Sequence, residues 1–302
     1  MLQAYIGLAK VAVMFIFGRG NEIRKAESYL KLSSILTAQA CHIMREGVVS
    51  AENYLRETMA FSIENGESAL AAFTSLGYTN WAVSLAENKK TDQELSNNPL
   101  DWGLKAMTFA EHFRSKYNPD IRSILVAYEA ISRALVAPIA HKNASNTTGQ
   151  VYFYDENFQN IIDTVTPIAS NYLSLAERCV QEGLMLTRKT SQAYDECTFS
   201  LLAAQVEWLK ITCQQNNVMF IAEVEKILTE TYAIAGRIEF RMLLTDIHVF
   251  CVEVLIDLKN LYPGYKEKLL GLTAAEHIKK TREYAIDTST YEDLFLPPDG
   301  TA

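Results

Sequence analysis

Apolar residues recur at helical spacing along nearly the whole chain. The region 21–45 illustrates the pattern, because its apolar residues gather on one face of a helix with 3.6 residues per turn. These residues are Ile23, Ala26, Leu30, Leu32, Ile35, Leu36, Ala38 and Ile43. We detect no alternation of apolar and polar residues long enough to predict a strand. The pattern therefore predicts an all-α chain.

Glycine, proline and polar clusters divide this pattern into roughly eleven helices. Asn98-Pro99 and Asn118-Pro119 are two similar helix starts, in which Asn supplies the cap and Pro occupies the first helical position. The polar run 87–98 predicts a loop. The predicted helices cover residues 2–17, 21–45 (ended by Gly47), 50–63 (capped by Ser50), 67–86, 100–117, 120–141, 156–183 (interrupted at Pro167), 187–214, 218–236, 239–261 and 266–284.

Short connections make sequential helices pack antiparallel, so we expect a stack of helical hairpins. The stack is predicted to form one helical-repeat domain over residues 1–286. The loop 142–155 is a possible sub-boundary within it, because residues 142–150 are rich in Asn, Ser, Thr and Gly. Residues 287–302 predict an irregular tail.

Composition and charge narrow the class of protein. Of the 302 residues, 49% are hydrophobic and 21% charged, which is typical of a globular chain. Gly and Pro are scarce, at 13 and 7 residues, which favours helices over a fold with many tight turns. The net charge of −8 is a poor match for nucleic acid or an anionic membrane. We therefore expect neither as a partner.

The N-terminal apolar run, residues 2–17, is too short for a membrane span, which needs about 20 apolar residues. It predicts a buried core helix, with a signal anchor as the alternative. The abrupt start and the short Pro-Pro tail suggest a fragment of a larger protein. Five cysteines without CxxC spacing favour small buried residues in a reducing, cytoplasmic compartment over disulfides or zinc. They are Cys41, Cys179, Cys197, Cys213 and Cys251.

No motif predicts catalytic, cofactor-binding or metal-binding residues. No histidine has Glu three residues before it, as an inward-facing di-iron motif requires, and HExxH is absent. Aspartate clusters, glycine-rich phosphate loops and the GxSxG motif are absent as well. Five aromatic residues could line a peptide-binding groove, although aromatics at helical spacing more often belong to the core. These are Tyr78, Trp81, Trp102, Tyr128 and Trp208.

The region 69–119 resembles a tetratricopeptide-type hairpin. Small residues stand beside large ones there, as two closely approaching helices need. Leu76-Gly77 matches the Leu-Gly pair of that repeat's first helix, and Ala106 and Ala110 match the alanines of its second. Pro119 falls where the repeat closes. The resemblance implies a tetratricopeptide-like superhelix of stacked hairpins.

A longer stretch is similar to the helical region of multidomain signalling ATPases. The segments that carry this resemblance are 103–113, 122–125, Pro138, 172–183 and Ala193. In that family such a region lies between an ATPase module and an output module such as a histidine kinase or a cyclase. The resemblance implies a relay or scaffold region without the activity of either module.

A third resemblance is to 14-3-3 proteins. The segments 124–128, 207–209 and 249–254 occur in the family's order. However, Glu129, Val136 and Glu207 stand where the family has its basic phosphate-binding residues. An acidic groove repels phosphate, so the usual phosphopeptide recognition is not expected.

The sequence thus predicts a non-catalytic protein-interaction or signal-relay scaffold in the cytoplasm, belonging to a larger signalling protein. It would bind a protein or peptide partner and is not predicted to be an enzyme. Two alternatives remain open. One is a helical small-ligand-binding domain or enzyme with a buried pocket, and the other is a diverged 14-3-3-like peptide-binding protein. The sequence specifies neither the partner nor the oligomeric state.

Overall fold

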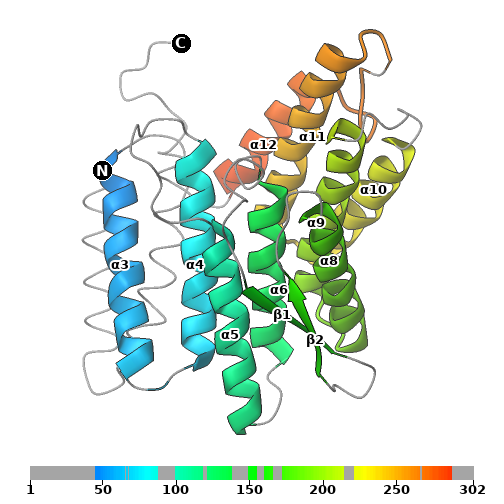
Figure 1. The fold of residues 1–302 in the computed structure, drawn as a ribbon. Helices are drawn as coiled ribbons and strands as arrows, with labels where there is room; N and C mark the ends of the chain where they lie inside the picture. The colour runs from blue at the N-terminus through cyan, green and yellow to red at the C-terminus, as the bar shows by residue number, and fades with distance from the viewer. Residues whose placement is uncertain are drawn as a thin grey trace. The chain divides into compact units, whose positions relative to one another are not determined.

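The computed structural model describes residues 45–64, 66, 68–87, 99–117, 121–137, 149–154, 160–165, 172–213, 221–265 and 267–287. Within these ranges helices dominate, which confirms the all-α class, and one short β-hairpin is added (Figure 1). The helices are α3 (Arg45–Glu64), α4 (Ser68–Glu87), α5 (Pro99–Tyr117), α6 (Ile121–Val136), α8 (Tyr172–Lys189), α9 (Ala193–Cys213), α10 (Ile221–Arg237), α11 (Arg241–Leu261) and α12 (Ala274–Asp287). The strands are β1 (Gly149–Tyr154) and β2 (Asn160–Val165).

The chain divides into two compact units, Met1–Cys179 and Val180–Ala302. The division falls within α8 and not in the loop 142–155, where the sequence suggested a possible sub-boundary. Predictions for residues 1–44, 88–98, 118–120, 138–148, 155–159, 166–171, 214–220 and 288–302 lie outside the described residues.

Helix α4 is the centre of the first unit, because it packs against α3, α5 and α6. Its sequence alternates small apolar and hydroxyl residues with few charges, as a helix covered on several sides requires. The buried hydroxyls of Thr74, Ser75 and Thr79 donate to the carbonyl four residues earlier, at 2.7, 2.9 and 3.0 Å. Each buried hydroxyl is therefore satisfied within its own helix.

Helices α5 and α6 approach closely at Gly103. A Cβ atom there would lie 3.0 Å from the Cα of Ile131, so only glycine fits without a shift of α6. Ala106 and Ala110, one and two turns further along α5, are fully buried. Small residues thus bring the backbones of α5 and α6 together in this region.

The β-hairpin corrects two predictions: residues 149–154, at the end of the predicted loop 142–155, form a strand, and so do residues 160–165, within the predicted helix 156–183. Strands β1 and β2 pair antiparallel, with Val151 opposite Asp163 and Phe153 opposite Ile161. Val151 and Phe153 are fully buried, which is the period-two pattern of a strand with one face inside. This alternation covers too few residues to stand out against the helical background. The residues Ile161, Ile162 and Val165 also favour a strand because their side chains branch at Cβ.

Two glycines that were predicted to end helices lie inside helices instead. Gly47 lies in the first turn of α3. Helix α3 therefore begins before Ser50, the predicted cap. Gly183 lies within α8, where a Cβ atom would approach the Phe199 ring of α9 to 2.3 Å. Gly183 therefore permits a close helix contact and does not end the helix. The chain instead turns at residues 190–192, where Ser191 adopts a positive φ of 57°.

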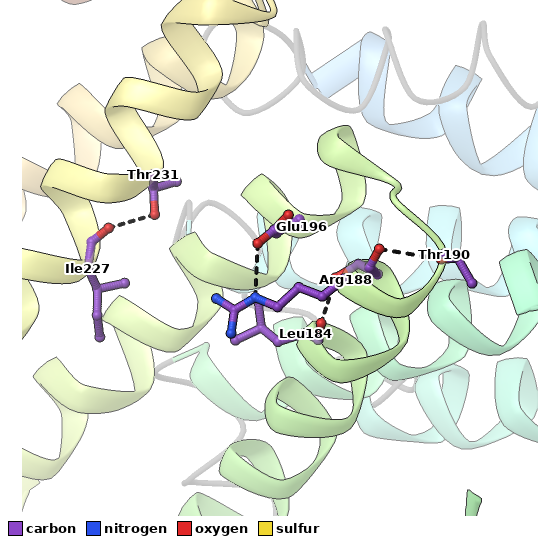
Figure 2. A network of polar contacts seen from close by, with 7 residues as sticks. Leu184, Arg188, Thr190, Glu196, Ile227 and Thr231 are labelled. Atoms are coloured by element: carbon purple, nitrogen blue, oxygen red, sulfur yellow. Dashed lines mark hydrogen bonds and ion pairs between the residues drawn. The ribbon is translucent and has the colours of Figure 1, made fainter. Parts of the chain in front are cut away.

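The second unit is built from α9 to α12 and the end of α8. Its core contains Trp208, Leu228, Phe250 and Leu258. Arg188 and Glu196 join α8 to α9 through an ion pair of 2.9 Å (Figure 2). In α10, the buried Thr231 hydroxyl donates to the Ile227 carbonyl at 2.7 Å (Figure 2).

Helix α12 begins later than the predicted start at residue 266. Leu270 and Gly271 adopt positive φ values of 48° and 76°, which breaks the helical path. Thr273 then caps α12, because its backbone N–H donates to Glu276 Oε2 at 2.8 Å. The Glu276 N–H donates in return to Thr273 Oγ1 at 3.3 Å, which completes a capping box. The T-x-x-E sequence at 273–276 is the sequence signal for the beginning of α12.

Candidate functional site

A buried pair of histidines is the most unusual polar feature of the described residues. His248 comes from the middle of α11 and His277 from the first turn of α12, and these two helices pack together. Their Nδ1 atoms lie 2.7 Å apart. His248 is 1% exposed and His277 is fully buried.

The contacts of His277 determine which nitrogens carry protons. His277 Nε2 lies 2.9 Å from the Leu269 carbonyl oxygen, which can only accept, so this nitrogen carries a hydrogen. When His277 is neutral, its Nδ1 is therefore an acceptor, and His248 Nδ1 must donate to it. Neutral His248 then has its lone pair on Nε2. This atom is buried and has no hydrogen-bond partner in the described structure.

Two tyrosines pack against His248. The Tyr284 ring of α12 stacks on it at 5.6 Å, and the Tyr232 ring of α10 meets it edge-on at 5.4 Å. The two tyrosine hydroxyls lie 3.0 Å apart and hydrogen-bond to each other. Burial and this hydrogen bond raise the pKa of Tyr232 to about 12. These contacts connect three helices through four ionisable side chains.

The surroundings favour the neutral form of both histidines. Burial, followed by the neighbouring His277 and Lys280, lowers the pKa of His248 to about 4. Burial also lowers the pKa of His277, although its hydrogen bond to Leu269 opposes this effect. The pair can hold and share a proton, but its burial keeps both rings from direct contact with a substrate in this conformation.

Sequence reasoning did not find this pair. The histidines were tested in the sequence only for metal-ligand motifs, and none was found. His248 and His277 lie 29 positions apart on separate helices, so no local motif connects them. A histidine on the buried face of α11, between Ile247 and Cys251, was the one available indication.

The five aromatic residues proposed for a groove belong mainly to the core. Tyr78, Trp81, Tyr128 and Trp208 are buried, whereas Trp102 is partly exposed. Tyr78 stacks on Trp102 at 3.9 Å, and Lys105 Nζ lies 3.8 Å from the centroid of the same indole. The core interpretation is therefore confirmed for four of the five.

Other predicted positions make structural contacts. Cys179, Cys197 and Cys251 are buried free thiols, as expected. Burial raises the pKa of Cys251 to about 12, so its thiolate is not formed near neutral pH. Glu129 and Glu207, which replace basic residues in the 14-3-3 comparison, pair within their helices with Arg133 and Lys210, each at 2.7 Å.

The described residues contain neither a cluster of metal ligands nor a membrane-spanning helix. No three His, Cys, Asp or Glu side chains there gather as metal ligands. None of the described helices combines the length and apolar content needed to cross a bilayer.

No protein-family model matches the chain, and no curated protein sequence matches it.

Proposed function

We propose that this chain is a non-catalytic helical scaffold that binds a protein or peptide partner. In this proposal the hairpins form a tetratricopeptide-like stack within a larger cytoplasmic signalling protein. The observation that carries the proposal is an exposed apolar stripe on α11. Val249 and Ile256 are 42% and 51% exposed and lie seven residues apart, on the same helix face.

The stripe is continuous along α11. Val252, one turn after Val249, lies on the same face and is partly exposed. The exposed carboxylates of Asp246 and Glu253 border one edge of the stripe. An apolar surface with a polar rim is typical of a protein-interaction site.

The hairpin packing supports the scaffold part of the proposal. In the first unit, α4 packs on α5 and α5 packs on α6, so sequential helices are neighbours. Small residues such as Gly103 set their close approach. Helical-repeat proteins use such hairpins to display binding surfaces rather than catalytic groups.

The test compares two charge-matched double variants as bait in cross-linking and mass spectrometry. V249D/I256D places two carboxylates in the stripe. T229D/A233D places two carboxylates on the exposed face of α10 and serves as the control. We expect specific partners to be lost with V249D/I256D and retained with the control. Equal retention by both variants would show that the stripe does not bind the partner.

A kinetic measurement addresses the non-catalytic part of the proposal. The purified chain should not convert nucleotides or other small molecules at a saturable rate. A saturable rate would instead support the alternative of a helical enzyme with a buried pocket.

A further inference from the structure

The histidine pair is placed where it can control the attachment of α12. His248 belongs to α11, while His277 belongs to α12 and also bonds the Leu269 carbonyl of the preceding turn. Leu269 and Leu272 close that turn through reciprocal backbone hydrogen bonds of 2.9 Å. The pair therefore connects α11, the turn and α12 in one chain of hydrogen bonds.

The number of protons decides whether this chain of hydrogen bonds can form. With both rings neutral, one hydrogen lies between the two Nδ1 atoms and one lies between His277 and Leu269. A first added proton occupies His248 Nε2, where a buried charge and a buried donor then lack an acceptor. A second added proton places N–H groups on both Nδ1 atoms, which lie 2.7 Å apart and can no longer bond.

Among the groups around His248, one carboxylate favours the added charge, and burial, His277 and Lys280 oppose it. From α10, the Tyr232 ring faces it, and from α12 it is approached by His277, Lys280, Glu283 and Tyr284.

The one carboxylate in this group, Glu283, is held by Lys280 at 2.7 Å. A second nearby carboxylate, Glu225 of α10, accepts the Leu270 N–H at 3.3 Å. The two tyrosine hydroxyls bond each other. A protonated His248 therefore gains an acceptor only if α12 moves.

We propose that the His248–His277 pair is a proton-responsive contact that holds α12 on α11 when both rings are neutral and releases α12 on acidification. This inference does not rest on the proposed scaffold function. It assigns the buried rings a regulatory role that needs no access for a substrate.

Hydrogen exchange of the full chain at pH 7 and pH 5, corrected for the intrinsic effect of pH, tests this proposal. The surroundings lower the pKa of His248 from 6.5 to about 4. When α12 has left α11, His248 regains its ordinary pKa, so the open state binds a proton at a higher pH than the closed state does. We expect the amides of α12 to open about 20-fold more often at pH 5, while those of α4 change little. Parallel loss of protection in α4 and α12 would indicate general acid unfolding and overturn the proposal.

Two variants make the test specific. H248F/H277Q removes both titrating rings, keeps an aromatic ring between the tyrosines and keeps an amide donor for Leu269. H112Q changes an exposed histidine of α5 and serves as the control. The pH effect on α12 should disappear in H248F/H277Q and persist in H112Q. An unchanged pH effect in H248F/H277Q would overturn the proposal.

A second measurement on the unmodified chain does not depend on the variants folding. Nitrogen NMR of the imidazoles should show His277 protonated on Nε2 and His248 on Nδ1 at pH 7. Protonation of His248 should coincide with the loss of protection in α12. If both rings titrate while α12 remains protected, the pair does not control the helix.

Discussion

The regions α3–α6 and α10–α12 both bury polar side chains, but the hydrogen bonds of these side chains differ in range. In α4, buried hydroxyls bond to the carbonyl four residues earlier in the same helix. In α10–α12, the Thr231 hydroxyl also bonds within its own helix, but the histidine pair and the Tyr232–Tyr284 contact bond across helices. A local bond remains as long as its helix remains, whereas a bond across helices requires both helices in place. The second region is therefore the more sensitive to pH and to small movements.

The largest expected effect is a loss of stability on acidification that depends on the histidine pair. The folded-state pKa of His248 is about 4, below its ordinary value of 6.5, so the unfolded chain binds the proton first. Stability is therefore complete above pH 6.5 and falls as the pH approaches 4, by about 3 kcal/mol from His248 alone. Urea denaturation at several pH values should show this loss.

Carboxylates elsewhere also titrate in this range, so the measurement requires a comparison. The difference in unfolding free energy between the unmodified chain and H248F/H277Q should shrink as the pH falls from 7 to 4. A difference that is constant over this range would mean that the two regions respond alike to acid.

The next effect concerns the close backbone approach in the first region. G103A places a Cβ atom 3.0 Å from the Cα of Ile131, and we expect a destabilisation of about 2 kcal/mol in urea denaturation. The control is G236A in α10, where a Cβ atom would meet nothing within 4 Å. That substitution should stabilise the chain by about 0.5–1 kcal/mol, because alanine favours a helix. Similar effects of the two substitutions would contradict the close approach.

A smaller effect is expected from Y232F, which removes a hydrogen bond between helices. The Tyr284 hydroxyl then loses its partner at 3.0 Å, at a cost of about 1 kcal/mol. The same change should remove one component near pH 12 from the ultraviolet titration of the tyrosines, because the raised pKa of Tyr232 no longer contributes. If Y232F leaves the free energy of unfolding unchanged, the tyrosine contact does not help to hold the three helices.

The smallest effect should come from T74V in α4. The Thr74 hydroxyl donates to the Leu70 carbonyl, which is also placed to accept from the helix backbone, so its loss leaves no group unsatisfied. We expect a change of at most about 0.5 kcal/mol that does not depend on pH. A loss as large as that of Y232F would remove the distinction between local bonds and bonds across helices.

Local features were predictable from the sequence. Helical spacing of apolar residues located α4, α5, α10 and α11 to within a few residues. The break between the predicted helices 50–63 and 67–86 contains Gly66, which adopts a positive φ of 68°. Helical spacing also favoured a core position for Tyr128, and Tyr128 is fully buried. This was predictable because a helix face is defined by residues close together in the chain.

Contacts between distant residues were decided by the tertiary structure. Gly183 was interpreted as a helix end because the sequence does not show the Phe199 ring that packs on it. The β-hairpin was missed because Val151 and Phe153 show their alternation only over a short run. His248 and His277 meet because α11 and α12 pack in one register, and helical spacing alone does not encode that register. The sequence by itself determined where most helices run, and the packing of helices determined which buried groups share a proton.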